Sequence, residues 1–208
     1  MISAQEALEC LREGNRRFAS GTCKRDTHLS HSQRAEMARE QAPFAIILGC
    51  SDSRVPTEIV FDQGLGDLFV IRVAGNIVAP SQVGSVEFAA TQFGTRLIVV
   101  LGHSKCGAVQ ATLEELRQPT KNGSRNPHSI VARIRPAIEK LLINQPKHDE
   151  DTLEKHAIRA NVSASASHLR HGSELLEQLI RNEGLLVVGA EYSIETGVVE
   201  FFDGVAAG

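Results

Sequence analysis

The sequence predicts an α/β protein whose central, mostly parallel sheet is covered by helices. Short continuous apolar runs, which are typical of buried strands, alternate along the chain with longer helical stretches. Strands that alternate with helices form βαβ units, and these place their strands in parallel. We expect the strand order 2-1-3-4, with a fifth strand at a C-terminal edge. At 208 residues, 42% hydrophobic and 23% charged, the chain is expected to form one domain over residues 1–208.

The N-terminal region is predicted to be a helical arm, residues 1–42. Residues 3–19 form an amphipathic pattern, and Ser3 with Glu6 three positions later is typical of a capping box. A second helix is expected over 30–41, beginning at a serine.

The remaining chain, 43–208, is predicted to be the α/β core. The expected strands are 44–48, 68–73, 97–101, 185–188 and 198–202. The expected helices are 80–93, 105–117, 128–144, 149–168 and 173–182. Residues 118–127 have the Pro, Gly, Asn and Ser content of a loop, and the Ala- and Ser-rich segment 164–167 is interpreted as a helix packing surface.

Composition argues against several classes of partner. Lys and Arg number 22 against 25 Asp and Glu, so the basic excess of a nucleic-acid binder is absent. There is no apolar run of the roughly 20 residues that a membrane helix needs, and no signal-peptide pattern. We therefore expect a cytoplasmic protein, in which Cys10, Cys23, Cys50 and Cys106 are free thiols or metal ligands rather than disulfides.

Chemistry-bearing residues gather where two predicted strands end. The first core strand runs into residues 49–55 (GCSDSRV), and the third runs into residues 102–107 (GHSKCG). In the expected order these strands are neighbours, so Cys50, His103 and Cys106 can converge at one edge of the sheet. Two thiolates and an imidazole are a typical zinc set that leaves a fourth position open. Zinc lowers the pKa of water bound there to roughly 7, which yields a hydroxide nucleophile.

Each of these signals is weak when it is taken alone. A buried cysteine at a strand end is usually a small hydrophobic residue, and a single His-x-x-Cys is common. The joint placement of the three residues favours the metal site. Asp52 and Arg54, two residues apart beside Cys50, then suggest a carboxylate near the metal that a guanidinium keeps ionised. Cys10 and Cys23 are interpreted as ordinary thiols.

These motifs resemble those of the β-class carbonic anhydrases. The resemblance rests on CSDSRV at 50–55 and GHSKCGA at 102–108. It extends through FDQGLGDLFVIRVAGNIV at 61–78, SVEFA at 85–89 and GNRRF at 14–18, with GAEYSIETGVVEFF near the end of the chain. It covers most of residues 5–110, and the paired motifs at this separation are highly specific.

The resemblance implies reversible hydration of carbon dioxide to bicarbonate and a proton by a zinc-bound hydroxide. It makes Cys50, His103 and Cys106 the ligands of one Zn²⁺ per subunit, and Asp52 with Arg54 the catalytic dyad. Around the substrate it places Gln41, Phe69, Phe88 and Gly107, although many members carry Tyr at the position of Phe88. It also implies a homodimer, or a dimer of dimers, with active sites at the interface and residues 3–40 in dimerisation.

One departure from the family bears on regulation. Members that are switched by bicarbonate carry Trp three residues before the zinc cysteine, where this chain has Ile47. We therefore predict that near neutral pH Asp52 pairs with Arg54 rather than with zinc, and a structure at about pH 7.5 with Asp52 on the metal would contradict this.

Three other functions remain as alternatives. A hydrolase of carbonyl sulfide or carbon disulfide would use the same ligands on the same scaffold. A structural or redox zinc module would bind the metal without catalysis, although structural sites normally carry four protein ligands. A nucleotide-binding protein is disfavoured, because the first core strand is followed by Cys-Ser-Asp-Ser-Arg instead of a glycine-rich phosphate loop.

Overall fold

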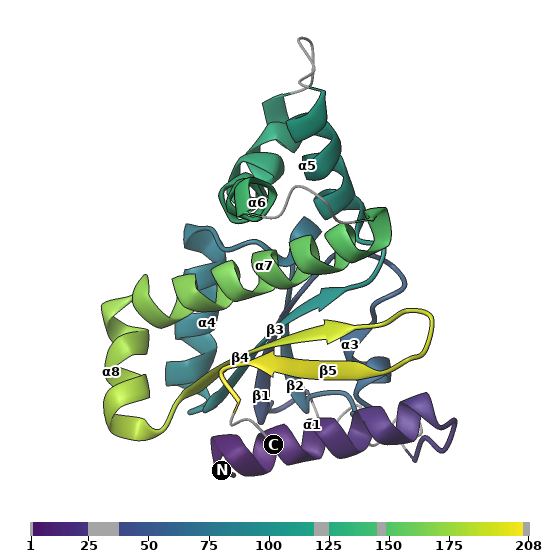
Figure 1. Ribbon diagram of the computed structural model, residues 1–208. Coiled ribbons are helices and arrows are strands. Elements are labelled where there is room, and N and C mark those ends of the chain that lie inside the picture. Colours follow the sequence, from purple (N-terminus) through teal and green to yellow (C-terminus); the bar gives the residue numbers. More distant parts are fainter. Residues whose placement is uncertain (1, 25–37, 119–124, 145–148, 206–208) are drawn as a thin grey trace.

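A five-stranded sheet forms the centre of the molecule (Figure 1). The computed structural model describes residues 2–24, 38–118, 125–144 and 149–205. The strand order is β2-β1-β3-β4-β5, with parallel pairing up to β4 and β5 antiparallel to β4, which confirms the predicted fold class. The strands are β1 (Ala45–Gly49), β2 (Leu68–Arg72), β3 (Leu97–His103), β4 (Leu186–Tyr192) and β5 (Val199–Asp203).

Helices connect the parallel strands and cover both faces of the sheet. They are α1 (Ala4–Ala19), α3 (Thr57–Val60), the 3₁₀ turn η1 (Ala74–Asn76), α4 (Pro80–Gln92), α5 (Gly107–Arg117), α6 (Arg125–Asn144), α7 (Glu150–His171) and α8 (Glu174–Glu183). The predicted helices agree with α1 and with α4 to α8, and α1 has the expected capping box between Ser3 and Glu6. The two single-turn elements, α3 and η1, were not predicted because they are too short to show a helical period.

Two predicted boundaries differ from the structure. Most of the helix predicted over 30–41 lies outside the described residues, but residues 38–41 are not helical. Pro43 disfavours helical backbone at the residue before it, so a helix ends ahead of that position. The predicted loop 118–127 lies partly outside the described residues and is too long at its end, because α6 begins at Arg125. Pro127 falls in the first turn, where proline costs no helical hydrogen bond.

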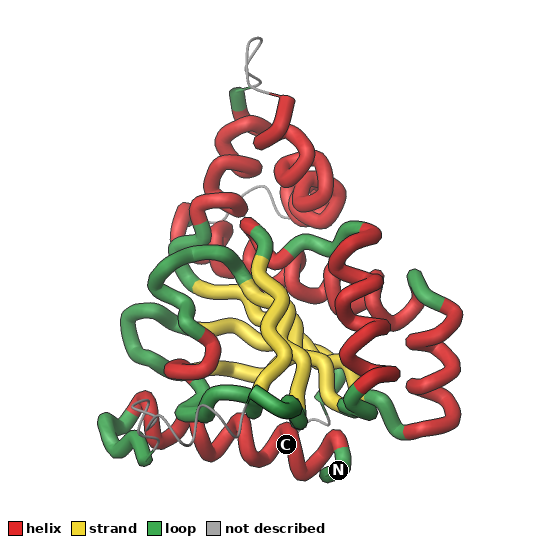
Figure 2. Tube along the Cα trace, turned by 180° about the vertical axis from the view of Figure 1, so that it is seen from behind, coloured by secondary structure: helices red, strands yellow, loops and turns green. Residues whose placement is uncertain are grey.

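The core has one apolar layer on each face of the sheet. In one layer α1 packs under alternate strand residues such as Ala45 and Ile47. In the other layer α4, α7 and α8 cover Ile46 and Leu48 (Figure 2). A third cluster, in which Ile134 and Ile138 of α6 meet residues of α5 and α7, lies at the carboxyl end of the strands. No helix in the described part of the chain is long and apolar enough to cross a membrane, and the cytoplasmic location stays a prediction.

The motif GNRRF docks α1 on the core of its own chain. A Cβ on Gly14 would lie 1.8 Å from the carbonyl oxygen of Phe61, so only glycine allows this approach. Asn15 is buried, donates to the carbonyls of Val60 and Gly197, and accepts from the amide of Val199. The first half of the predicted arm is therefore a layer of the monomer core, and the role of residues 1–42 in dimerisation stays a prediction.

Helix α7 lies so close to the sheet that two strands need glycine beneath it. A Cβ on Gly102 of β3 or on Gly189 of β4 would come within 2.5 Å and 2.8 Å of Val162 side-chain carbons. Ala166, from the Ala- and Ser-rich segment, is buried against the sheet, and Ser165 is buried and donates to the carbonyl of Asn76 in η1. The predicted packing surface is thus confirmed, and the close approach brings α7 to the carboxyl ends of the strands.

We predict that Gly14→Ala destabilises the protein by about 1–3 kcal/mol or more, because the new methyl group meets backbone that cannot yield. Urea unfolding monitored by circular dichroism measures the loss. The control is Glu13→Ala, an exposed change in the same helix that should alter the free energy of unfolding by less than about 0.5 kcal/mol. Equal stability of the two variants would contradict the docking role of Gly14.

Candidate metal centre

Cys50, His103 and Cys106 come together at the carboxyl edge of the sheet. Cys50 directly follows β1, His103 ends β3, and Cys106 precedes α5. In the parallel register Gly49 lies opposite Leu101, so both strands end at the same edge. The candidate ligand atoms of the three residues all lie within 4.8 Å of one another, and the residues are 5%, 0% and 1% exposed. The predicted convergence is confirmed.

The hydrogen bonds of His103 suit a metal ligand. Its Nδ1 lies 2.9 Å from the carbonyl oxygen of Ser104, which favours the tautomer with the proton on Nδ1. Its Nε2 is buried and has no hydrogen-bond partner among the described residues. A buried nitrogen lone pair normally has a partner, and a metal held together with two sulfurs would provide it. The donor set therefore fits zinc.

The two sulfurs differ in their electrostatic environment. The neighbouring Cys106 thiol lowers the pKa of Cys50 against the effect of burial, with His103 and the Gly75 amide assisting. The nearby Cys50, together with burial, raises the pKa of Cys106. Binding of a metal to both sulfurs would require both thiols to lose their protons.

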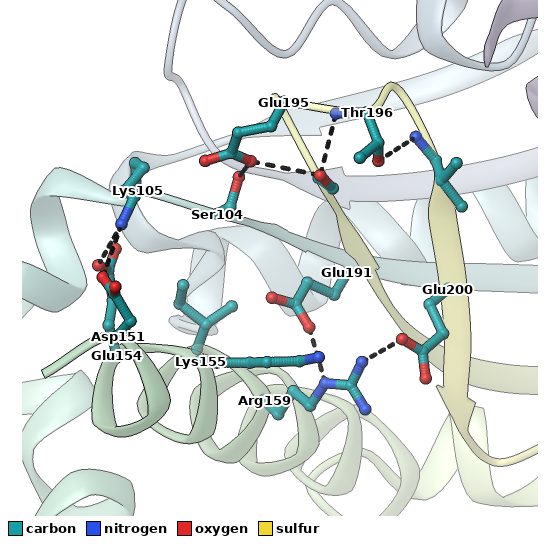
Figure 3. A pocket seen from close by; sticks show the side chains of 13 residues that line it. Ser104, Lys105, Asp151, Glu154, Lys155, Arg159, Glu191, Glu195, Thr196 and Glu200 are labelled. Carbon is teal, nitrogen blue, oxygen red and sulfur yellow. Dashed lines mark hydrogen bonds and ion pairs between the residues drawn. The ribbon is translucent and has the colours of Figure 1, made fainter. Parts of the chain in front are cut away.

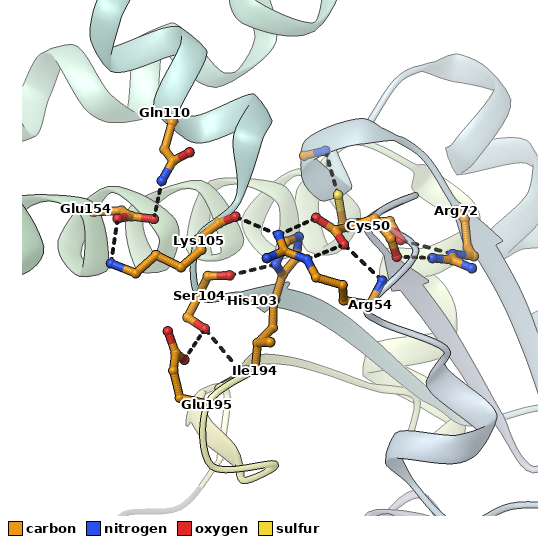
Figure 4. Close-up of polar contacts among 12 residues, drawn as sticks. Cys50, Arg54, Arg72, His103, Ser104, Lys105, Gln110, Glu154, Ile194 and Glu195 are labelled. Carbon is orange, nitrogen blue, oxygen red and sulfur yellow. Dashed lines mark hydrogen bonds and ion pairs between the residues drawn. The ribbon is translucent and has the colours of Figure 1, made fainter.

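Asp52 and Arg54 form a bidentate ion pair in the loop that follows Cys50, and Figure 4 shows Arg54 near Cys50 and His103. Arg54 Nε donates to Oδ1 at 2.9 Å and Nη2 donates to Oδ2 at 2.8 Å, while the Arg54 amide also donates to Oδ1. These bonds hold the pKa of Asp52 well below its usual range. Arg54 Nη2 also donates to the carbonyl of Lys105 at 3.1 Å, so the pair bridges the two loops that carry the sulfurs.

Arg72, at the end of β2, supports the same loop and was not singled out from the sequence. Its Nε donates to the carbonyl of Cys50 at 3.0 Å, and its Nη2 donates to the carbonyl of Asp52 at 2.5 Å (Figure 4). In the sequence, the feature that could have indicated this role is the position of Arg72 at the end of the predicted strand next to β1. The guanidinium thereby fixes the main chain on both sides of Ser51.

Of the predicted substrate contacts, the fold brings only Gly107 to the ligands of the same chain. Gly107 begins α5 directly after Cys106, and a Cβ there would meet nothing within 4 Å. Gln41 precedes β1, at the opposite end of that strand from Cys50. Phe69 pairs with Ile46, four residues before Cys50 and so about 13 Å away along the strand.

Phe88 belongs to an aromatic cluster around Phe69. Its ring centroid lies 6.2 Å from that of Phe69 and 5.7 Å from that of Phe93, and Phe88 is 52% exposed. These rings therefore form a surface on β2 and α4 that is separate from the metal ligands of their own chain.

A cleft of about 320 Å³ with many charged side chains lies beside Ser104 and Lys105, which follow β3 (Figure 3). Its walls come from α7 and from the β4–β5 hairpin. Arg159 donates to Glu191 at 2.7 Å and also pairs with Glu200, while Lys105 pairs with Asp151 and Glu154. None of the three candidate metal ligands lines this cleft.

The fold and the site together define an α/β protein in which two cysteines and a histidine form a candidate metal site. A family model described as carbonic anhydrase matches residues 45–199. Carbonic anhydrase 2 of Mycobacterium tuberculosis is 39% identical over 194 residues, which cover 92% of this chain and 89% of that protein. The carbonic anhydrase of Mycolicibacterium smegmatis is 37% identical over 196 residues, covering 93% and 91%.

Solved structures agree with these relatives. The β-carbonic anhydrase CcaA aligns with a TM-score of 0.74 and 26% identity over 95% of each chain. The β-carbonic anhydrase CafA of Aspergillus fumigatus aligns with a TM-score of 0.75 over 98% of this chain and 92% of that one, and at 23% identity it supports the fold alone. The chain belongs to the β-carbonic anhydrase family, and it is an enzyme of the carbonic anhydrase class.

Proposed function

We propose that this enzyme catalyses the zinc-dependent, reversible hydration of carbon dioxide to bicarbonate and a proton. The observation that carries the proposal is the buried Cys50–His103–Cys106 cluster, with ligand atoms within 4.8 Å of one another. Zinc held by these residues supplies a Lewis acid that brings the pKa of a water in its open fourth position to roughly 7. The surrounding side chains then orient that water and the substrate.

Asp52 is proposed as the hydrogen-bond acceptor that orients the attacking water. Because Arg54 donates two bonds to it, the carboxylate stays ionised and accepts rather than donates. Arg54 is itself held by the carbonyl of Lys105, so the carboxylate keeps a fixed direction relative to both sulfur-bearing loops. This arrangement supports the prediction that near neutral pH Asp52 pairs with Arg54 rather than with zinc.

Gly107 is proposed to leave room for the substrate. The first amides of a helix have no partner within the helix, and a Cβ on Gly107 would meet nothing within 4 Å apart from its chain neighbours and its own helix. A small, uncharged, linear molecule such as carbon dioxide suits that space. Carbonyl sulfide and carbon disulfide share this shape, so their hydrolysis is the second candidate function.

We further propose that Gln41, Phe69 and Phe88 act on the site of a partner subunit. Their positions at the far end of the strands do not bring them to the metal ligands of their own chain. The half-exposed aromatic cluster on β2 and α4 supports a second copy of this chain as its cover. The β-carbonic anhydrases of Sordaria macrospora are described as tetrameric, and we propose a homodimer or a dimer of dimers here.

We predict that the purified enzyme carries one zinc per chain and hydrates carbon dioxide in a zinc-dependent manner. Stopped-flow hydration from about pH 6.5 to about pH 9, with stripped and zinc-reloaded protein alongside, measures this directly. Activity should disappear on stripping and return with zinc. Zinc-loaded protein that hydrolyses carbonyl sulfide or carbon disulfide but leaves carbon dioxide unchanged would establish the second candidate, and inactivity on all three gases would indicate a structural zinc site.

We predict that Asp52→Asn lowers kcat/KM for hydration by roughly 100-fold or more, since the amide cannot replace an ionised acceptor. Zinc content should stay at the wild-type level because Asp52 is not among the proposed ligands. Asp151→Asn is the matched control, a change in an exposed carboxylate that also pairs with a cation of the site loops. Wild-type activity in Asp52→Asn would exclude the proposed role.

We predict that Phe88→Lys dissociates the dimer and lowers hydration activity, because each site then loses the residues that its partner supplies. Analytical ultracentrifugation and hydration rates, both measured over a range of protein concentrations, test the two effects together. Val198→Lys changes a similarly exposed apolar residue at the opposite edge of the sheet and serves as the control. A fully active monomer of Phe88→Lys would refute the contribution in trans.

A further inference from the structure

Gly75 of η1 joins a candidate metal ligand to the interior face of α7. Its amide donates to Cys50 Sγ at 3.3 Å, and its carbonyl accepts from Asn161 Nδ2 at 2.8 Å. All three residues are buried, with Asn161 2% and Cys50 5% exposed. The bond to Asn161 therefore forms away from bulk water, where losing it leaves a carbonyl without a partner.

The backbone of Gly75 lies close to α5 and α6 and has a conformation that favours glycine. Its φ of 68° lies in the left-handed region, where glycine avoids the strain of a side chain. A Cβ here would lie 2.7 Å from Ile134 Cδ1 and 3.0 Å from Ala108 Cβ. Glycine is thus required by both conformation and space, but its lack of a side chain leaves its own peptide planes free to turn.

A neighbouring hydrogen bond restrains one of these planes. Asn161 holds the carbonyl of Gly75, and the amide of the same residue points at the Cys50 sulfur. The two bonded groups lie in the two peptide planes that meet at the Gly75 Cα, and the bond to Asn161 fixes the plane on the carbonyl side. The plane that carries the amide is thereby held against a fixed neighbour. The direction of the N–H···S bond consequently depends on the side chain of Asn161.

We propose that Asn161 is a positioning residue for the Cys50 sulfur, acting through the main chain of Gly75. The role rests on the proposed function, in which Cys50 binds zinc. An amide that donates to a thiolate withdraws charge from the sulfur, and partners of this kind orient metal ligands and tune their metal. Asn161 therefore sets both the zinc affinity of the site and the electron density on one of its sulfurs.

Helix α7 offers a matched control one turn further along. Ser165 Oγ donates to the carbonyl of Asn76 at 3.0 Å, which is the next carbonyl along the same turn. Ser165 is also buried, and Ser165→Ala removes one hydrogen bond between α7 and η1, as Asn161→Ala does. The two variants differ in which residue they release. Asn161→Ala frees the carbonyl of Gly75, whose own amide contacts the Cys50 sulfur, whereas Ser165→Ala frees the carbonyl of Asn76, for which no such contact is found among the described residues. The two variants therefore separate anchoring of η1 from positioning of the sulfur.

The test compares Asn161→Ala and Ser165→Ala with the wild type in zinc affinity, measured by competition with a chromophoric chelator. We expect Asn161→Ala to bind zinc about 10-fold more weakly or worse, and Ser165→Ala to bind it within about threefold of wild type. In cobalt-substituted protein the sulfur-to-metal charge-transfer band of Asn161→Ala should move to longer wavelength, because a sulfur with fewer hydrogen bonds gives up electron density more easily. Melting temperatures report how far both variants are destabilised.

Asn161→Leu provides the same test with a similarly branched side chain that has no donor. It replaces Asn161→Ala if that variant does not fold. Zinc affinity and a cobalt spectrum equal to those of wild type, in either Asn161 variant, would overturn the positioning role. Equal losses in Ser165→Ala would also overturn it and indicate general anchoring of η1. Wild-type protein that takes up no zinc would instead refute the proposed function, and this role with it.

Discussion

The parallel register between β1 and β3 is the constraint on which the rest of the site depends. Gly49 lies opposite Leu101, so the chain leaves both strands at one edge of the sheet and there turns into the two sulfur-bearing loops. Strand pairing is rigid and buried on both faces, and it fixes the starting points of the loops before any metal binds. Two short loops then need only small adjustments to bring three ligand atoms within 4.8 Å.

Hydrogen bonds with neighbouring parts of the chain fix the direction of the two loops. Arg72 of β2 holds the carbonyls beside Ser51, Arg54 reaches from one loop to the carbonyl of Lys105 in the other, and the amide of Gly75 contacts a sulfur. Each partner comes from a different element of the fold. A site built in this way keeps the main chain around its candidate ligands hydrogen-bonded, and the buried Nε2 of His103 is left for a metal.

The two ends of the sheet have different proposed tasks. The carboxyl end carries the ligands, the dyad and the open space at Gly107, whereas Gln41 and the aromatic residues lie toward the amino end. Since a strand separates the two groups by about 13 Å, one chain is not expected to supply both to the same substrate. The proposed dimer reconciles the resemblance with this geometry. The docking of α1 by Gly14 and Asn15 keeps that helix in the monomer core, whichever segments meet the partner.

The sequence by itself determined the α/β class, the strand order, the long helices and the convergence of Cys50, His103 and Cys106. These follow from local apolar periods and from the rule that parallel strands end at one edge, and both can be read along the chain. Only the tertiary structure decided the roles of Arg72, Gly75 and Asn161. Their contacts join positions 20 to 86 residues apart, and they depend on how closely α7 approaches the strands. Side-chain packing sets that approach, and a pattern of residue types along one chain carries no measure of it.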